Sequence, residues 1–359
     1  MERIHNWLDI ADRFHQQNLL LGNGASIAID KCFQYDSLLD EARSKSYITT
    51  SVDDVFTRFA VADFELVLRR LWQAKEVNSA FSLPAGPIEQ GYKDVQDALI
   101  NTVQNSHVSY TDAEPHFSIL EAFLKRFDTV LSLNYDLTLY WATQTANRTL
   151  DRWFVDCFVS GYFDDDWSRF KKAYRASGRT LCFYPHGNLI FCRYGFSNER
   201  KISTGASDNL LDAIFHEWKA NGKAPLFVSE GTKDLKLNAI SSSYYLKKVY
   251  FEVIPDMAGS LVIYGWGMGD HDKHIIDQIK KSQIDRIAVS VFGGDQTYIG
   301  NVKQKLSPLN LRELVFFDAQ SEGVWINPIA ANQNNPDEGL PIVSLPYGEK
   351  ITHMYVIRD

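Results

Sequence analysis

The sequence predicts an α/β fold built on a doubly wound, mostly parallel, Rossmann-like sheet with a helical insertion. Three observations predict it. Short apolar runs alternate with longer helical patterns along the 359 residues, which is the order of elements in a doubly wound sheet. The runs are apolar at nearly every position, as are strands that are covered on both faces. The first run ends in a Gly-x-Gly turn and continues as a helical pattern, a connection that this fold uses.

Six apolar runs are predicted to be strands of this sheet. They lie at residues 18–22, 129–134, 225–229, 260–265, 286–292 and 313–317. With 45% hydrophobic residues over its length, the chain can bury a large core around them.

The segments between these strands are predicted to be helical. Residues 37–126 form the insertion, and residues 233–257 a second helical stretch. Within the insertion, helical spacing is expected to place the following side chains on one stripe: Phe56, Phe59, Ala60, Phe64, Val67, Leu68 and Leu71. Residues 1–317 are expected to form one domain, and the turn-rich residues 318–359 an irregular tail packed on it.

Composition argues against several classes of partner. The formal net charge is −8 and the isoelectric point is near 5.6, without a lysine or arginine block that would bind a phosphate backbone, so no direct nucleic-acid partner is expected. No run approaches the roughly twenty apolar residues of a membrane span, and the first residues carry acids where a signal peptide would be apolar. A cytoplasmic protein is expected.

The cysteines also favour a reduced compartment. Cys32, Cys157, Cys182 and Cys192 are scattered without a C-x-x-C pair. That spacing fits structural thiols better than a disulfide framework or a zinc site.

The turn after the first predicted strand is a candidate phosphate site. Gly22, Gly24, Ala25 and Ser26 lie where a strand ends and a helix begins, so their backbone N–H groups would converge at the positive end of a helix dipole. The alternative is purely structural, because a strand-to-helix turn often needs glycine for its backbone conformation.

A second polar turn follows the strand at 129–134. Asn134 and Asp136 end that run, and because parallel strands end at the same edge of a sheet, they are expected to face the same crevice as Gly22–Ser26. Taken alone, Asp136 could cap the next helix and Asn134 could fill a turn.

Two further features add to this set. His186 interrupts an apolar run between a proline and a glycine, where it is either a local turn residue or a functional one. Gly265, Gly267 and Gly269 follow the strand at 260–265 and precede Asp270, which is expected to cap a helix. The nearby set of Asp270, His271, Asp272 and His274 lacks a matching ligand set elsewhere in the sequence, so no metal is expected.

Taken in order, Gly-x-Gly-Ala-Ser, Asn-x-Asp, His-Gly and the late glycine-rich turn before D-x-x-x-H-I resemble the sirtuin-like superfamily of NAD-consuming proteins. The resemblance covers residues 18–295 and is closest to the prokaryotic NAD hydrolases that act as antiphage effectors. The chain is also similar to a bacterial sirtuin-like family of unknown function. It differs from the deacylases in lacking a four-cysteine zinc module. It also has Gly265-Trp266-Gly267-Met268 in place of Gly-Thr-Ser, and Asp63-Phe64-Glu65 in place of Asp-Phe-Arg.

The resemblance implies cleavage of the nicotinamide–ribose bond of NAD, with NAD as substrate and ADP-ribose as product. It implies that Gly22, Gly24, Ala25 and Ser26 hold the pyrophosphate and that Gly265 and Gly267 contact the nucleotide. Asn134 would orient the ribose or water, Asp136 would brace that loop, and His186 would act as a base. A non-catalytic sensor of NAD or ADP-ribose is one alternative. A sirtuin-type ADP-ribosyl transferase or deacylase is the other.

An NAD hydrolase of this kind is expected to be controlled, because unregulated turnover would drain the cell's cofactor. The irregular tail is too short to form a sensor domain of its own. A homo-oligomer or a neighbour-encoded sensor subunit is therefore expected. The insertion carries Arg69, Arg70, Trp72 and Phe81 close together, residue types that are frequent at interface hot spots, although a buried helical layer would explain them equally.

Overall fold

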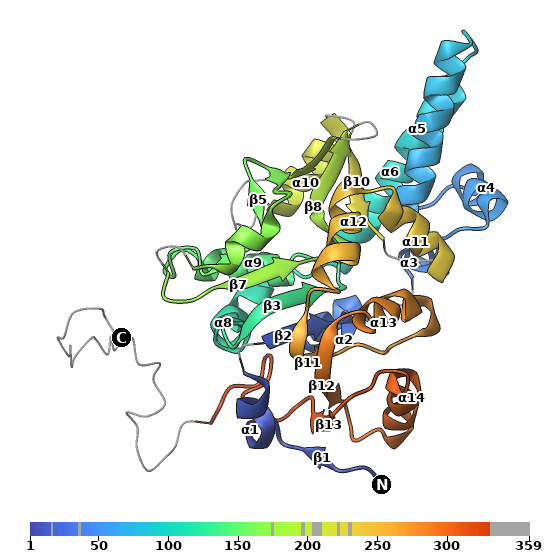
Figure 1. Cartoon of the computed structure of the whole chain (residues 1–359). Coiled ribbons are helices and arrows are strands. Elements are labelled where there is room, and N and C mark those ends of the chain that lie inside the picture. The colour runs from blue at the N-terminus through green and yellow to red at the C-terminus, as the bar shows by residue number, and fades with distance from the viewer. Residues whose placement is uncertain are drawn as a thin grey trace, which may run out of the picture.

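A parallel eight-stranded sheet forms the centre of the protein (Figure 1). The computed structural model describes residues 1–15, 17–34, 37–173, 176–194, 198–202, 210–220, 223–228 and 232–330. In order across the sheet, the strands are β1 (Ile4–His5), β13 (Glu313–Asp318), β12 (Gln283–Val291), β11 (Ala258–Tyr264), β2 (Gln17–Leu21), β3 (Phe127–Ser132), β7 (Thr180–Phe183) and β4 (Phe154–Val155). All neighbouring pairs are parallel. The predicted fold class is confirmed.

The strand order is that of a Rossmann sheet with an extra strand at each edge. From β2 the chain moves outward through β3 and β7, and it later returns to the other side of β2 through β11, β12 and β13. The direction in which successive strands are added to the sheet therefore reverses between β2 and β11. In open α/β sheets the ligand crevice lies at such a reversal, outside the carboxyl ends of the strands.

One predicted strand belongs to a different sheet. The run at 225–229 forms β10 (Ala224–Phe227), which pairs antiparallel with β8 (Gly187–Tyr194) in a three-stranded sheet completed by β9 (Asn198–Lys201). Its apolar residues correctly indicated burial but could not specify the partner strand. A separate two-stranded antiparallel ribbon, β5 (Phe158–Val159) with β6 (Tyr162–Phe163), comes between β4 and β7 in the sequence.

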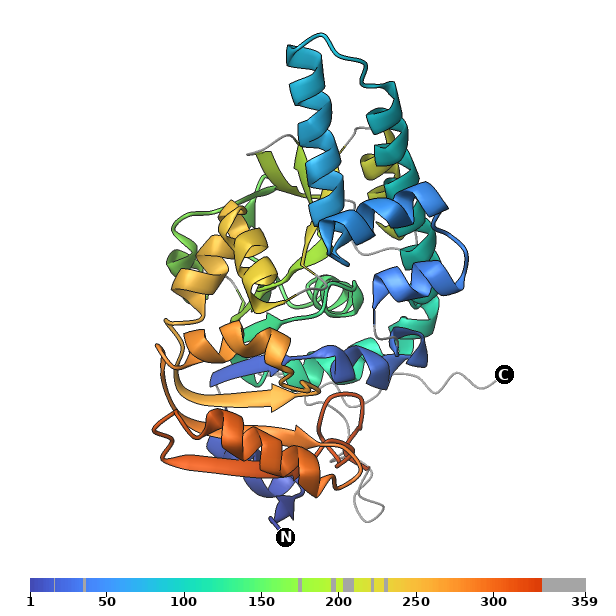
Figure 2. The same cartoon turned by 90° about the vertical axis from the view of Figure 1, so that its right-hand side faces the viewer.

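Helices occupy most of the segment between β2 and β3. After α2 (Asn23–Ile29) come α3 (Leu38–Ser44), α4 (Thr50–Phe59), α5 (Phe64–Ala80), α6 (Gly86–Ser106), α7 (Tyr110–Ala113) and α8 (Phe117–Leu124). The helices α5 and α6 form a hairpin that projects away from the central sheet (Figure 2).

The single apolar stripe predicted for this insertion is wrong, because the helix breaks within it. Ala60 ends α4 in a left-handed conformation with φ of 51°, and Asp63 begins α5 by accepting a hydrogen bond from the N–H of Leu66 (3.1 Å). As a result Phe59 is 39% exposed. Phe56 on α4 and Phe64 on α5 still pack edge to face, with ring centroids 4.9 Å apart. The buried faces of the two helices therefore remain in contact across the break.

The remaining helices cover the sheet and the chain ends. They are α1 (Trp7–Ile10), α9 (Thr138–Ala146), α10 (Leu210–Ala220), α11 (Lys233–Ser241), α12 (Tyr244–Lys248), α13 (Lys273–Ile279) and α14 (Gln296–Leu306). The predicted helical stretch at 233–257 is two helices followed by a π-helical turn, Val249–Val253. No helix in the described part of the chain is long and apolar enough to span a membrane.

The first part of the predicted tail belongs to the core. Trp325 is 1% exposed, and its indole N–H donates to the carbonyl of Ala25 (2.8 Å). Residues 331–359 of the predicted tail lie outside the described residues.

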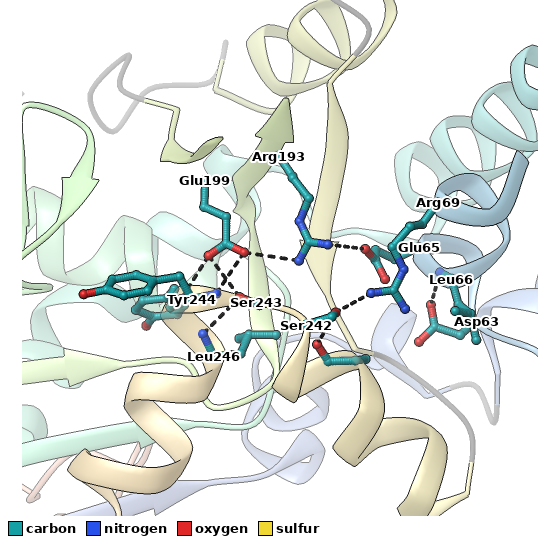
Figure 3. Close-up of polar contacts among 12 residues, drawn as sticks. Asp63, Glu65, Leu66, Arg69, Arg193, Glu199, Ser242, Ser243, Tyr244 and Leu246 are labelled. Atoms are coloured by element: carbon teal, nitrogen blue, oxygen red, sulfur yellow. Dashed lines mark hydrogen bonds and ion pairs between the residues drawn. The ribbon is translucent and has the colours of Figure 1, made fainter. Parts of the chain in front are cut away.

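A buried ion-pair network fixes the base of the α5–α6 hairpin to the small sheet (Figure 3). Arg193 on β8 lies 3.6 Å from Glu65 on α5 and 3.2 Å from Glu199 on β9, and these three side chains are at most 10% exposed. Glu199 also accepts the N–H groups of Tyr244 and Tyr245 at the start of α12. Burial raises the pKa of Glu65, and the positive charges of Arg69 and Arg193 oppose this shift.

We expect Arg193→Ala to destabilise the protein by about 3–5 kcal/mol, because it would leave two buried carboxylates without their shared cation. Urea unfolding followed by circular dichroism measures this. Lys219→Ala is the matched control, since it removes an exposed ion pair with Asp97 (2.8 Å) and should cost at most about 1 kcal/mol. Equal losses in the two variants would contradict a structural role for the buried network.

Candidate functional site

The carboxyl ends of four neighbouring strands bring the predicted site loops to one edge of the sheet. Gly22 follows β2, Asn134 follows β3, His186 follows β7, and Gly265 follows β11. These strands are adjacent and parallel in the order β7, β3, β2, β11. The strand order, not the strand direction, reverses between β2 and β11, so the loops surround the expected crevice.

The two glycine turns at the reversal are bonded to each other. The N–H of Gly22 donates to Tyr264 O (3.0 Å), and the N–H of Gly24 donates to Gly265 O (2.7 Å). The N–H of Ala25 donates back to Gly22 O (2.9 Å). These three donors were expected to bind pyrophosphate. In the structure each already has a protein acceptor, so they could bind pyrophosphate only by sharing or breaking these bonds.

Close backbone packing explains most of the glycines in these turns. A Cβ atom on Gly24 would lie 2.8 Å from Gly265 Cα, and one on Gly265, where φ is +68°, would lie 2.4 Å from Ala25 N. Gly267 differs, because a Cβ there meets no atom within 4 Å. Substitution of Gly24 would therefore strain the fold before it affected a ligand, whereas Gly267 faces open space.

Asn134, Ser26 and Asp136 form a hydrogen-bonded network beside the first turn. The amide nitrogen of Asn134 donates to Gly22 O (3.0 Å) and to Ser26 Oγ (2.8 Å). Ser26 Oγ donates to Asp136 Oδ2, while Asp136 Oδ1 accepts the N–H of Thr138 (2.8 Å) at the start of α9. Both amide protons of Asn134 are thus engaged. The side-chain oxygen of Asn134 is the group that this arrangement leaves for a ligand.

The loop that carries His186 is tied to the Asn134 loop. The N–H of Leu189 donates to Tyr135 O (2.8 Å), and the side chain of Asn188 donates to Asp136 O (2.6 Å). Gly187 makes the close approach of β10 possible, because φ there is +79° and a Cβ would lie 2.2 Å from Leu226 O. His186 and Asn134 therefore belong to one bonded pair of loops.

His186 contacts a second histidine that follows β11. Its Nε2 lies 2.9 Å from Nε2 of His274, and the two side chains are 4% and 0% exposed. Asp272 lies beside them, held by the ammonium of Lys236 (2.8 Å) and the indole N–H of Trp266 (3.1 Å). The structure thus adds three charged or titratable groups to the predicted His186.

Burial keeps both imidazoles neutral. Desolvation, reinforced by the charge of Lys236, brings the pKa of His186 well below its usual range. Desolvation also lowers the pKa of His274 to about 4, although the Asp272 carboxylate opposes this shift. Burial alone would raise the pKa of Asp272, but His186 and Lys236 bring it well below the ordinary value.

His186, Asp272 and His274 also have the donor types of a metal site. One potential ligand atom from each residue lies within 4.8 Å of the others. His186 therefore provides a further metal-ligating side chain beside the residues at 270–274, which the sequence alone did not indicate. Lys236, however, already neutralises Asp272 at 2.8 Å. A divalent cation would leave two uncompensated positive charges among these buried side chains. The residues do not fit a divalent metal well.

A pocket of about 650 Å³ opens on the β11 side of the same edge, a size that is typical of small-molecule sites. Its wall includes three predicted nucleotide contacts: Gly24, Gly265 and Gly267. Lys31, Phe292 and Asp295 also line the pocket. Phe292 is 73% exposed and offers an aromatic face. The pocket and Asn134 adjoin the same Gly22–Gly24 turn.

Sequence reasoning missed part of this site. Asp272 and His274 were recognised in the sequence as an acid and an imidazole two residues apart. Lys236 and Trp266, which bind Asp272, could not be recognised as its partners because nothing in the sequence around them indicates this contact. The cap predicted at Asp270 is wrong: Asp270 begins a short 3-10 turn, Asp270–Asp272, and Asp272 occupies the N-cap position of α13. The Asp270 carboxylate lies 2.9 Å from the Lys305 ammonium.

Comparison with known proteins gives a family but no function. A family model described as Domain of unknown function (DUF4917) matches residues 19–325. No curated protein matches the chain.

The neutral histidines predict a loss of stability in mild acid. The unfolded state takes up protons near pH 6.5, whereas His274 in the folded state has a pKa of about 4, so stability falls as the pH drops through this window. We expect the free energy of unfolding to decrease by about 1–3 kcal/mol between pH 7 and pH 5. In His274→Gln the decrease should be smaller, and identical pH profiles for the two proteins would contradict the buried neutral pair.

Proposed function

The chain belongs to the DUF4917 family, a domain family of unknown function, and from its site we propose that it is an NAD hydrolase that releases nicotinamide and ADP-ribose. One observation carries the proposal: a nucleotide-sized pocket at the sheet reversal shares the Gly22–Gly24 turn with the Asn134 loop. This arrangement supports one extended substrate, with its adenosine end in the pocket and its reacting ribose beside Asn134 and His186.

The pocket offers groups that suit the adenosine diphosphate part of NAD. The exposed ring of Phe292 can stack on a purine base, and the carboxylate of Asp295 on the same wall can accept hydrogen bonds from ribose hydroxyls. Lys31 lines the pocket near the first turn. Its ammonium supplies the positive charge for the pyrophosphate, a role for which the N–H groups of Gly22, Gly24 and Ala25 are not free.

The reacting end needs groups that stabilise a cationic ribose and accept a proton from water. The side-chain oxygen of Asn134 can face the reacting ribose, and the Asp136 carboxylate, which is bonded to Ser26 and Thr138, adds negative charge to the same loop. Negative charge and oxygen dipoles stabilise an oxocarbenium-like state. The neutral ring of His186 keeps a lone pair that can accept this proton. Burial lowers the pKa of His186 and so makes it a weaker base than a free histidine. Water then bonds to the ribose carbon as nicotinamide leaves with the electron pair of the broken bond, and the water's proton passes to His186.

A non-catalytic nucleotide sensor is the second candidate. It is favoured by the burial of His186, which is 4% exposed and already bonded to His274. A deacylase has less support, since Cys157, Cys182 and Cys192 are buried free thiols. The hydrolase and the sensor differ in whether nicotinamide is released.

The pocket is tested by filling it. Gly267→Leu adds a side chain into open space on a backbone that accepts it, so we expect a folded protein that binds NAD at least about tenfold more weakly. Gly300→Leu, on the exposed face of α14 and also free of contacts within 4 Å, is the control. Calorimetric titration with NAD measures both. Unchanged affinity in Gly267→Leu would place the nucleotide elsewhere.

The chemistry is tested by nicotinamide release. Asn134→Ala and His186→Ala should each lower turnover by two to four powers of ten, roughly the effect of losing a general base. Thermal unfolding must accompany the assay, because Asn134 also supports the Gly22 turn. Binding of NAD without any release by the unaltered protein, alone and with the products of neighbouring genes, would favour the sensor.

We also propose that hydrolysis, as an antiphage effector activity, depends on assembly of the chain with itself or with a sensor subunit. The tip of the α5–α6 hairpin exposes Val77, Phe81 and Leu83, as an interaction surface would. Arg69 and Arg70 are instead used internally, Arg69 on Ser242 and Arg70 over the ring of Phe59. Turnover per molecule should rise with protein concentration or added subunit. Full turnover by a dilute monomer would contradict this.

A further inference from the structure

The contact between His186 and His274 constrains where the protons of both rings lie. Two neutral imidazoles whose Nε2 atoms are 2.9 Å apart form a hydrogen bond only if one Nε2 carries a proton and the other does not. A neutral imidazole has a single N–H, so fixing the proton at one Nε2 also fixes the state of each Nδ1. The tautomers of the two histidines are therefore coupled.

Two arrangements satisfy this contact. In the first, His186 donates from Nε2, and its Nδ1 keeps a lone pair that can accept a proton from water. In the second, His274 donates, and His186 carries its proton on Nδ1, where it can only donate. The proposed hydrolysis, on which this inference rests, requires the first arrangement.

The surroundings hold the His274 ring firmly in place. His274 is 0% exposed, its ring plane lies within 25° of that of His186 with centroids 5.1 Å apart, and its carbonyl accepts the hydroxyl of Tyr250 (2.9 Å). Among the described residues, Nδ1 of His274 makes no hydrogen bond of full geometry, but the backbone carbonyl of His271 interacts with this ring as an acceptor and acts to raise the pKa of His274. In the first arrangement Nδ1 carries the proton, and this carbonyl together with the negative charge of Asp272 favours that state.

We propose that His274 is a positioning residue for His186: it accepts the Nε2 proton of His186 and so leaves Nδ1 of His186 free to act as the base. Asp272, anchored by Lys236 and Trp266, supports the pair electrostatically. When His186 takes the proton of the attacking water on Nδ1, it becomes an imidazolium that still donates from Nε2 to His274. The added positive charge is stabilised in part by the nearby Asp272 carboxylate, whose negative charge is shared with the Lys236 ammonium.

The role of His274 is tested with two amides of different reach. Glutamine places its amide near the position of Nε2, whereas asparagine reaches only near Nδ1. We expect His274→Asn to lower kcat for nicotinamide release by about 10- to 100-fold, as loss of an orienting partner does, with KM within twofold because His274 does not touch substrate. His274→Gln should recover most of the lost kcat. Equal loss in both variants, or a change in KM alone, would overturn the positioning role.

A second measurement does not depend on turnover. Nitrogen-15 spectra that correlate the ring nitrogens with ring protons show which nitrogen of each histidine is protonated. We expect His186 to be protonated at Nε2 in the unaltered protein and to lose this preference in His274→Asn. Protonation of His186 at Nδ1 in the unaltered protein would overturn the inference even if nicotinamide is released. The expected tautomer without any release would count against the proposed hydrolysis and leave the histidine coupling in place.

Discussion

The rest of the structure depends on the packing of two glycine turns between β2 and β11, where the strand order of the sheet reverses. The turn after β2 and the turn after β11 approach so closely that Gly24 N lies 2.7 Å from Gly265 O, and a Cβ on Gly24 would lie 2.8 Å from Gly265 Cα. This contact joins the two halves of the sheet at their carboxyl ends. It also sets the distance between the pocket on the β11 side and the polar loops on the β3 side, so any ligand that spans both must cross these turns.

The fold was predictable because buried parallel strands leave a continuous apolar signal. Five of the six predicted runs lie in the central sheet, since burial on both faces makes nearly every residue apolar. The same signal failed at β10, which is equally apolar but pairs with β8. Strand pairing is a non-local property. The break between α4 and α5 was missed for a different reason: Asp63 caps the new helix inside what looks like one stripe.

The structure confirms that the predicted loops meet at one edge of the sheet, whereas the roles of their residues stay predictions. The polar loops after β2, β3, β7 and β11 meet at one edge because topology alone requires it. The backbone donors of Gly22, Gly24 and Ala25, which were predicted to bind pyrophosphate, are bonded to other parts of the protein, a competition that a sequence cannot reveal. His274 was discounted because its partner, His186, is 88 residues away in the chain. Lys236 and Phe292 gave no signal because their neighbours come from other elements.

The account makes one central claim, that the pocket and the Asn134–His186 loops hold a single nucleotide across the glycine turns. A crystal structure with ADP-ribose, the proposed product, tests it most directly. The account predicts the adenine against Phe292, the diphosphate near Lys31, and the distal ribose within hydrogen-bond distance of Asn134. An ADP-ribose molecule bound away from Gly267 and Asn134, or a site that stays empty at saturating ligand, would contradict it.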